Sequence, residues 1–136
     1  MRTWARCLTT CATLLLPAIL LRIPSTAQQP GFRGAPASAA ADKNPYAGNA
    51  AAANAGQKLY AKNCAQCHGN NLQGMGPAPA LDTASVRQAK AGELFWFITT
   101  GKMSSGMPSW GALSNQQRWQ IVTYLDSRAG QKTAAK

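Results

Sequence analysis

Apolar residues recur at helical spacing in three stretches of the chain, and each stretch predicts a helix. The first helix is expected over about residues 50–65, the second over about residues 93–100 and the third over about residues 114–130. Ser114 and Gln117 form a capping-box pattern at the start of the third helix. No stretch alternates between apolar and polar residues over a useful length, so an all-α fold of three to four helices is predicted. The apolar face of the third helix consists of Ile121, Val122, Tyr124 and Leu125.

Two long stretches between the predicted helices, residues 69–92 and 102–113, are rich in glycine and proline. Irregular loops of this length are uncommon in a small helical domain unless they wrap around something. The sequence therefore predicts that these loops close around a large buried cofactor.

The first residues of the chain have the pattern of a secretory signal peptide. Two arginines precede an apolar run at residues 7–21, and the small residues Ser25-Thr26-Ala27 follow it. Cleavage after Ala27 would remove residues 1–27 and leave the remainder in the periplasm. A retained membrane anchor is the alternative, but the apolar run is shorter than the about 20 residues that span a bilayer. A cleaved signal peptide is therefore expected, with membrane attachment only if this segment is retained.

The rest of the chain divides into a lead-in, one domain and a short tail. Residues 28–53 are rich in Ala, Gly and Pro and hold almost nothing large to bury, so a flexible lead-in is expected there. The folded unit is assigned to residues 54–130, and residues 131–136 to a disordered tail. A chain of 136 residues has room for one such domain.

The chain is strongly basic, with a formal net charge of +10 from 14 Lys and Arg against 4 Asp and Glu. One interpretation is a ring of positive charge that steers an acidic partner, and the other is ordinary solvation of the surface. Nucleic acid is not an expected partner, because the chain is exported and lacks a tract of interleaved basic and aromatic residues. The basic residues of the folded unit include Lys58, Lys62, Arg87, Lys90 and Lys102.

Residues 64–68 read Cys-Ala-Gln-Cys-His, the spacing of covalent haem c attachment. The thiols of Cys64 and Cys67 can add across the two vinyl groups of one haem, and His68 then lies beneath the iron as its proximal ligand. Covalent attachment holds a large cofactor in a domain too small to enclose it fully. A zinc site would need four ligands, whereas the exported chain keeps two cysteines and one histidine. A thioredoxin-like redox pair expects a βαβ setting, which the pattern lacks.

The second axial ligand of the iron must come from a methionine, because the chain has no second histidine. Met75 follows His68 too closely to reach the opposite face of the ring easily. Met103 and Met107 both lie in the Gly-rich loop after the second predicted helix. The proline after Met107 stiffens the chain there, and Trp110 can pack against the ring. Met107 is therefore favoured, and Met103 is the alternative.

With these residues in place, the chain from about residue 54 to about residue 127 resembles a mono-haem class I cytochrome c. Gly56 and Tyr60 match the glycine and the aromatic residue of the family's N-terminal helix. Ile121 and Tyr124 match the apolar and aromatic pair of its C-terminal helix, which crosses the first helix closely. The ligand loop of bacterial members, Met-Pro-x-Trp-Gly, is matched by Met107-Pro108-Ser109-Trp110-Gly111.

The resemblance implies a class I cytochrome c fold wrapped around one covalent haem c and its iron. It also implies that a proline carbonyl accepts a hydrogen bond from the ligating histidine. Pro79, followed by Leu81, resembles the family's Pro-x-Leu element, and Pro77 remains the alternative. In the same way the resemblance supports Met107 as the distal ligand, with Trp110 among the residues that bind the cofactor.

The function expected from this resemblance is electron transfer without chemistry on a substrate. The chain also looks like the small cytochromes that accompany bacterial periplasmic dehydrogenases. The hypothesis is a periplasmic carrier that takes single electrons from a dehydrogenase and passes them to an oxidase or another cytochrome. A haem enzyme or gas-binding sensor with an open sixth position is one alternative, although the single histidine is already used. A fixed cytochrome subunit of a dehydrogenase complex is the other.

Overall fold

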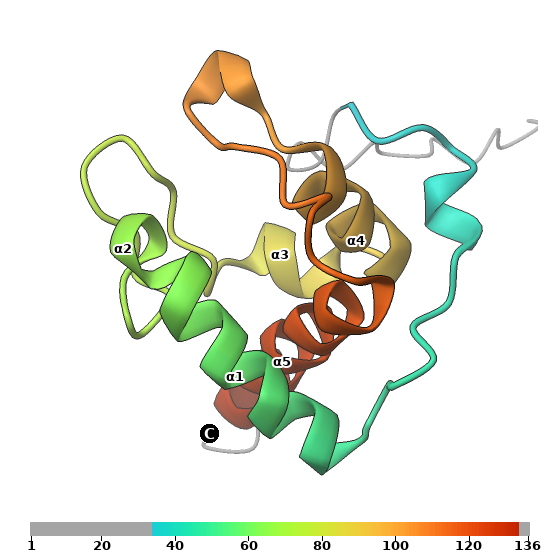
Figure 1. Ribbon diagram of the computed structural model, residues 1–136. Coiled ribbons are helices and arrows are strands. Elements are labelled where there is room, and N and C mark those ends of the chain that lie inside the picture. Colours follow the sequence, from blue (N-terminus) through green and yellow to red (C-terminus); the bar gives the residue numbers. More distant parts are fainter. Residues whose placement is uncertain (1–33, 134–136) are drawn as a thin grey trace, which may run out of the picture.

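The computed structural model describes residues 34–133 of the chain, whose regular elements are helices joined by long loops (Figure 1). The described residues form no named strand, and isolated bridges join Met75 with Ala78 and Lys102 with Met107. The all-α prediction is therefore confirmed. The helices are α1 (Ala50–Asn63), α2 (Ala65–His68), α3 (Ala84–Gln88), α4 (Ala91–Thr100) and α5 (Asn115–Thr133), with 3-10 turns at Ala39–Ala41 and Met103–Ser105.

The predicted helices have the expected places, with three differences at their ends and between them. The first predicted helix is divided at Cys64 into α1 and the single turn α2. Helix α3 lies inside a stretch predicted to be loop; its N-cap Thr83 accepts a hydrogen bond from the amide of Val86. Helix α5 continues through Gly130 into the predicted tail, because one glycine costs a helix only about 1 kcal/mol.

The start of α5 follows the capping box that the sequence predicted. The amide of Gln117 donates to Oγ of Ser114 at 3.2 Å, and the amide of Ser114 donates to Oε1 of Gln117 at 2.9 Å. These two bonds satisfy backbone donors that would otherwise have no partner at a helix N-terminus. They fix where the last helix begins.

Helices α1 and α5 form the main packing interface of the domain. Gly56 of α1 lies against the backbone of α5, and a Cβ there would overlap the carbonyl group of Gln120. The rings of Tyr60 and Tyr124 meet across this interface with their centroids 5.4 Å apart. The close approach requires glycine at position 56, which agrees with the role implied by the resemblance. The side chains of Tyr60, Leu72, Ile121 and Val122 are the largest that are fully buried.

The described part of the lead-in packs on the domain. Ala39 is buried, and its 3-10 turn lies so close to α4 that a Cβ on Gly92 would overlap the carbonyl oxygen of Ala39. The side-chain amide of Asn44 donates to Oγ1 of Thr123 in α5 at 3.0 Å. The chain before α1 is therefore attached to both α4 and α5 at these points.

The predicted signal peptide and its cleavage after Ala27 lie outside the described residues, as does the end of the predicted tail. The division of the chain into lead-in, domain and tail remains a prediction. Within residues 34–133, no helix is both long enough and apolar enough to cross a membrane.

Candidate haem site

The two cysteines and the histidine of the attachment pattern lie together where α1 gives way to α2. The amide of Cys64 still donates to the carbonyl of Tyr60 at 2.8 Å, as in a continuing helix. The amide of His68 donates to the carbonyl of Cys64 at 2.9 Å, which winds the five residues into one more turn. Cys64 is partly buried and Cys67 is exposed, and both are free thiols rather than a disulfide.

The two thiols differ in their surroundings. Burial raises the pKa of the Cys64 thiol to about 11, and the neighbouring Cys67 adds to this increase. Cys64 therefore keeps its proton at neutral pH and is a poor thiolate nucleophile. Among the described residues, no three or more His, Cys, Asp or Glu side chains are arranged so that they alone could hold a metal ion.

The imidazole of His68 is oriented by the loop that follows it. Its Nδ1 lies 2.9 Å from the carbonyl oxygen of Pro79, a hydrogen bond in which Nδ1–H donates. No other hydrogen bond to this ring occurs among the described residues, so Nε2 is left for another partner. A histidine that donates from one nitrogen to a carbonyl is held in the tautomer that can ligate a metal with the other.

The geometry also distinguishes the two prolines that the sequence left open. Pro77 lies in a tight turn that the bridge between Met75 and Ala78 closes. The amide of Ala78 donates to the carbonyl of Met75 at 3.0 Å, so Gly76 and Pro77 are the central residues of this turn. The carbonyl in hydrogen-bond contact with His68 belongs to Pro79.

Leu72 holds the two arms of the histidine loop, residues 69–83, together. Its carbonyl accepts hydrogen bonds from the amides of Leu81 and Asp82, at 2.7 and 3.3 Å. Its side chain is only 2% exposed, and its φ of 65° lies in a region that bulky residues rarely adopt. The burial of this leucine and the two bonds outweigh the backbone strain. This role could not be predicted from the sequence, because only Gly and Asn mark left-handed positions reliably.

The methionine loop, residues 101–113, returns along the end of α4. The amide of Lys102 donates to the carbonyl of Met107 at 2.8 Å, and the amide of Met107 donates back to the carbonyl of Lys102 at 3.2 Å. These bonds close the small loop that carries the 3-10 turn. Met107 is partly buried at its base, whereas Met103 in the turn is 74% exposed. Two backbone hydrogen bonds therefore fix Met107, whereas Met103 lies in an exposed turn.

Trp110 lies on the inner side of the same loop. Its amide donates to the carbonyl of Ile98 at 3.0 Å, and its side chain packs against the hydrophobic core. The histidine loop and the methionine loop both project from the helices toward the top of Figure 1. Of the residues that the sequence predicted, Cys64, Cys67 and His68 thus lie at and in α2, Pro79 lies on the histidine loop, and Met107 and Trp110 lie on the methionine loop.

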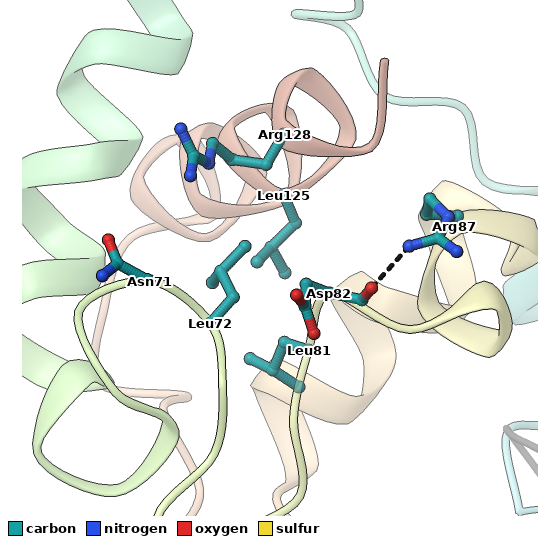
Figure 2. A pocket seen from close by; sticks show the side chains of 7 residues that line it. All are labelled: Asn71, Leu72, Leu81, Asp82, Arg87, Leu125 and Arg128. Carbon is teal, nitrogen blue, oxygen red and sulfur yellow. Dashed lines mark hydrogen bonds between the residues drawn. The ribbon is translucent and has the colours of Figure 1, made fainter. Parts of the chain in front are cut away.

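A separate small pocket lies between the histidine loop, α3 and α5 (Figure 2). Its volume of about 20 Å³ gives room for one water molecule. Arg87 donates to the carbonyl of Asp82 at its edge, as the dashed line in Figure 2 shows. The pocket is far too small for a porphyrin, so it is not the cofactor site. Its lining is Asn71, Leu72, Leu81, Asp82, Arg87, Leu125 and Arg128.

The donor set around α2 fits haem c. Two free thiols one helical turn apart, an imidazole with Nε2 available and a methionine on a second loop are the groups that attach and ligate a haem. Two residues that support the site could not be recognised from the sequence. They are Leu72 and Arg118, and Arg118 is only 7% exposed in the first turn of α5. The burial of a single arginine on the polar side of a helix cannot be predicted from the sequence pattern.

Comparisons with known proteins place this fold and site in a family. The family model described as cytochrome C oxidase, cbb3-type, subunit III matches residues 51–125. The solved structure of cytochrome cL from the marine methylotrophic bacterium Methylophaga aminisulfidivorans is similar, with a TM-score of 0.54 and 25% sequence identity. The similarity covers 69% of this chain and 71% of that one. A comparison with curated proteins gave no match.

The matched residues contain the complete attachment pattern, nearly all of α1 and the part of α5 up to Leu125, which includes the crossing residues Gly56, Gln120 and Tyr124. The structural neighbour is itself a c-type cytochrome. The chain therefore belongs to the cytochrome C oxidase, cbb3-type, subunit III family, as a class I c-type cytochrome that transfers electrons through covalently bound haem c and its iron and is not an enzyme.

Proposed function

We propose that this chain is a periplasmic electron carrier whose haem is bound through Cys64 and Cys67 and ligated by His68 and Met107. When bound, the haem supplies a one-electron change between Fe(II) and Fe(III). The observation that carries the proposal is the contact of 2.9 Å between Nδ1 of His68 and the carbonyl of Pro79. A free histidine has no need of such a fixed orientation, whereas a metal ligand does.

Each side chain has a separate task in this proposal. The two cysteines fix the ring to the end of α1, where backbone hydrogen bonds already hold them. The hydrogen bond from Nδ1 increases the electron density at Nε2 of His68 and keeps the ring in one plane. Met107 provides a thioether, a ligand that raises the reduction potential compared with harder donors. Two ligands supplied by the protein would let the haem change its oxidation state with little reorganisation.

Trp110 and the core limit the access of water to the cofactor. The indole packs against the same cluster of buried side chains that includes Ile98 and Leu94. A dry environment on this side strengthens electrostatic interactions and prevents exchange of the thioether for water. The exposed position of Cys67 leaves one edge of the attachment site near the surface, where a partner could exchange electrons.

The partners that we propose are a periplasmic dehydrogenase as donor and an oxidase or another cytochrome as acceptor. Lys62 lies in the last turn of α1 beside the attachment pattern, and Lys102 lies at the base of the methionine loop; both are exposed. Positive charge at this end would speed encounter with an acidic partner. The electron-transfer rate should then fall as the ionic strength rises, and a rate independent of salt would remove charge steering from the proposal.

The test of the axial ligand is the optical spectrum of Met107→Ala beside Met103→Ala. We expect the first variant to lose the low-spin spectrum with methionine–iron ligation and the second to keep it. Mass spectrometry of each variant, matured in a host that attaches haem c, should give one covalent haem in both. A bare polypeptide mass for the unaltered chain would contradict the whole proposal, and a normal spectrum for Met107→Ala would contradict the ligand alone.

A further inference from the structure

Arg118 is a buried cation whose hydrogen-bond partners are all neutral. Its Nη1 donates to Oγ1 of Thr99, its Nη2 donates to the side-chain oxygen of Asn115, and its Nε has no hydrogen-bond partner. The guanidinium carbon lies 4.9 Å from the centre of the Phe95 ring, a cation–π distance. The side chain is only 7% exposed. A charge buried without a carboxylate is costly, so its retention calls for a specific role.

Helix α4 provides the negative end that faces this cation. Thr99 lies in the last turn of α4, the end at which the helix dipole places a partial negative charge. The hydroxyl of Thr99 also donates to the carbonyl of Phe95 at 2.7 Å. Arg118 therefore holds the C-terminal turn of α4 through a side chain that is itself fixed to that helix.

The same turn of α4 carries the methionine loop. The hydroxyl of Ser109 donates to the carbonyl of Thr99 at 2.6 Å, and the amide of Trp110 donates to the carbonyl of Ile98 at 3.0 Å. Gly101 follows directly, and a Cβ there would lie 2.5 Å from the carbonyl carbon of Pro108. The segment that begins with Met107 is thus fastened to the residue that Arg118 contacts.

We propose that Arg118 is a positioning residue for the methionine ligand, acting through Thr99. This inference rests on the proposed function, in which Met107 ligates the iron. With Arg118 in place, the end of α4 and the segment 107–111 form one rigid support. Without it, the support loosens and the methionine leaves the iron more often, although the cysteine–histidine side is unchanged.

The test is a titration of the ferric holoprotein with imidazole, which binds iron only when the methionine has left. We expect Arg118→Gln to lower the apparent dissociation constant of imidazole by about tenfold, because the open state is more populated. Thr99→Val removes the acceptor of Arg118 with little change of shape and should act in the same direction. If Arg118→Gln does not fold, Thr99→Val tests the same contact by itself.

Two matched controls separate this effect from general damage. Thr100→Val removes a similar bond from a threonine hydroxyl to the carbonyl four residues earlier, at Trp96, without touching Arg118. Arg87→Gln removes the same charge from an exposed arginine. Both should stay within about twofold of the unaltered protein. Imidazole affinities of Arg118→Gln and Thr99→Val that equal those of the controls would overturn the inference.

Met107→Ala distinguishes a failure of the ligand assignment from a failure of the role proposed for Arg118. If it binds imidazole no more tightly than the unaltered protein, Met107 is not the ligand and the proposed function fails on that point. If it binds much more tightly while Arg118→Gln and Thr99→Val do not, the ligand assignment stands and only the role of Arg118 is refuted.

Discussion

The histidine loop and the methionine loop have the same task in the proposed site but are held in different ways. The histidine loop is fixed from within, by the buried side chain of Leu72 and by two backbone bonds to its carbonyl. The methionine loop has no fully buried side chain between residues 101 and 113, and hydrogen bonds to the end of α4 hold it from outside. The histidine side thus depends on a fully buried side chain, and the methionine side mainly on hydrogen bonds to the end of α4 and on the partly buried Trp110.

This difference has a consequence for function. Loss of a core contact lowers the free energy of unfolding of the whole domain, whereas loss of a surface hydrogen bond mainly changes a local opening equilibrium. We therefore expect damage to the histidine loop to reduce global stability and damage to the methionine loop to change ligand exchange. We expect this pattern if His68 is the permanent ligand of the carrier and Met107 is the ligand that can be replaced.

The largest effect should follow Leu72→Ala. The side chain is 2% exposed, so its truncation leaves a cavity, and the alanine must still adopt the left-handed backbone. We expect the free energy of unfolding to fall by about 2–5 kcal/mol, measured by chemical denaturation of the holoprotein. Met103→Ala, from a side chain that is 74% exposed, should change it by less than about 0.5 kcal/mol. Equal losses for the two variants would abolish the distinction between the loops.

A smaller effect is expected for Tyr60→Phe. The hydroxyl of Tyr60 donates to the carbonyl of Gly69 at 2.6 Å, the residue that directly follows the histidine ligand. Its removal leaves the carbonyl of Gly69 with only the amide of Leu72 as a donor, at 3.2 Å. The loss of this buried hydrogen bond should lower the free energy of unfolding by about 1–2 kcal/mol. Tyr124→Phe is the control, because its buried ring packs on the same interface and the structure gives its hydroxyl no hydrogen bond. A loss as large in the control would mean that packing alone matters here.

The parts of the site that the sequence predicted are those set by neighbours along the chain. The attachment pattern occupies one helical turn, and the capping box at Ser114 fixes the start of α5 through contacts three residues apart. Gly56 was matched by resemblance, and the overlap with Gln120 gives its physical reason. Local geometry is enough for such features.

What the sequence did not predict depends on contacts between distant segments. The choice between Pro77 and Pro79 follows from the path of the whole loop, which Leu72 determines by bonding to residues nine and ten positions later. The burial of Arg118 results from α4 packing across α5. The lead-in looked featureless because its anchors, Ala39 and Asn44, bind residues more than fifty positions away.

The smallest global effect, and the sharpest test of the comparison, is expected for Ser109→Ala. Its hydroxyl is exposed at the surface; it donates to the carbonyl of Thr99 and accepts from the amide of Gly111. Loss of these two exposed bonds should lower the free energy of unfolding by only about 0.5–1.5 kcal/mol. The rate at which imidazole displaces the methionine should nevertheless increase severalfold, measured by stopped-flow absorbance. Ser105→Ala in the neighbouring 3-10 turn is the control, since the structure gives that hydroxyl no hydrogen bond. A displacement rate that stays unchanged while stability falls would mean that the methionine side, too, is held by the core.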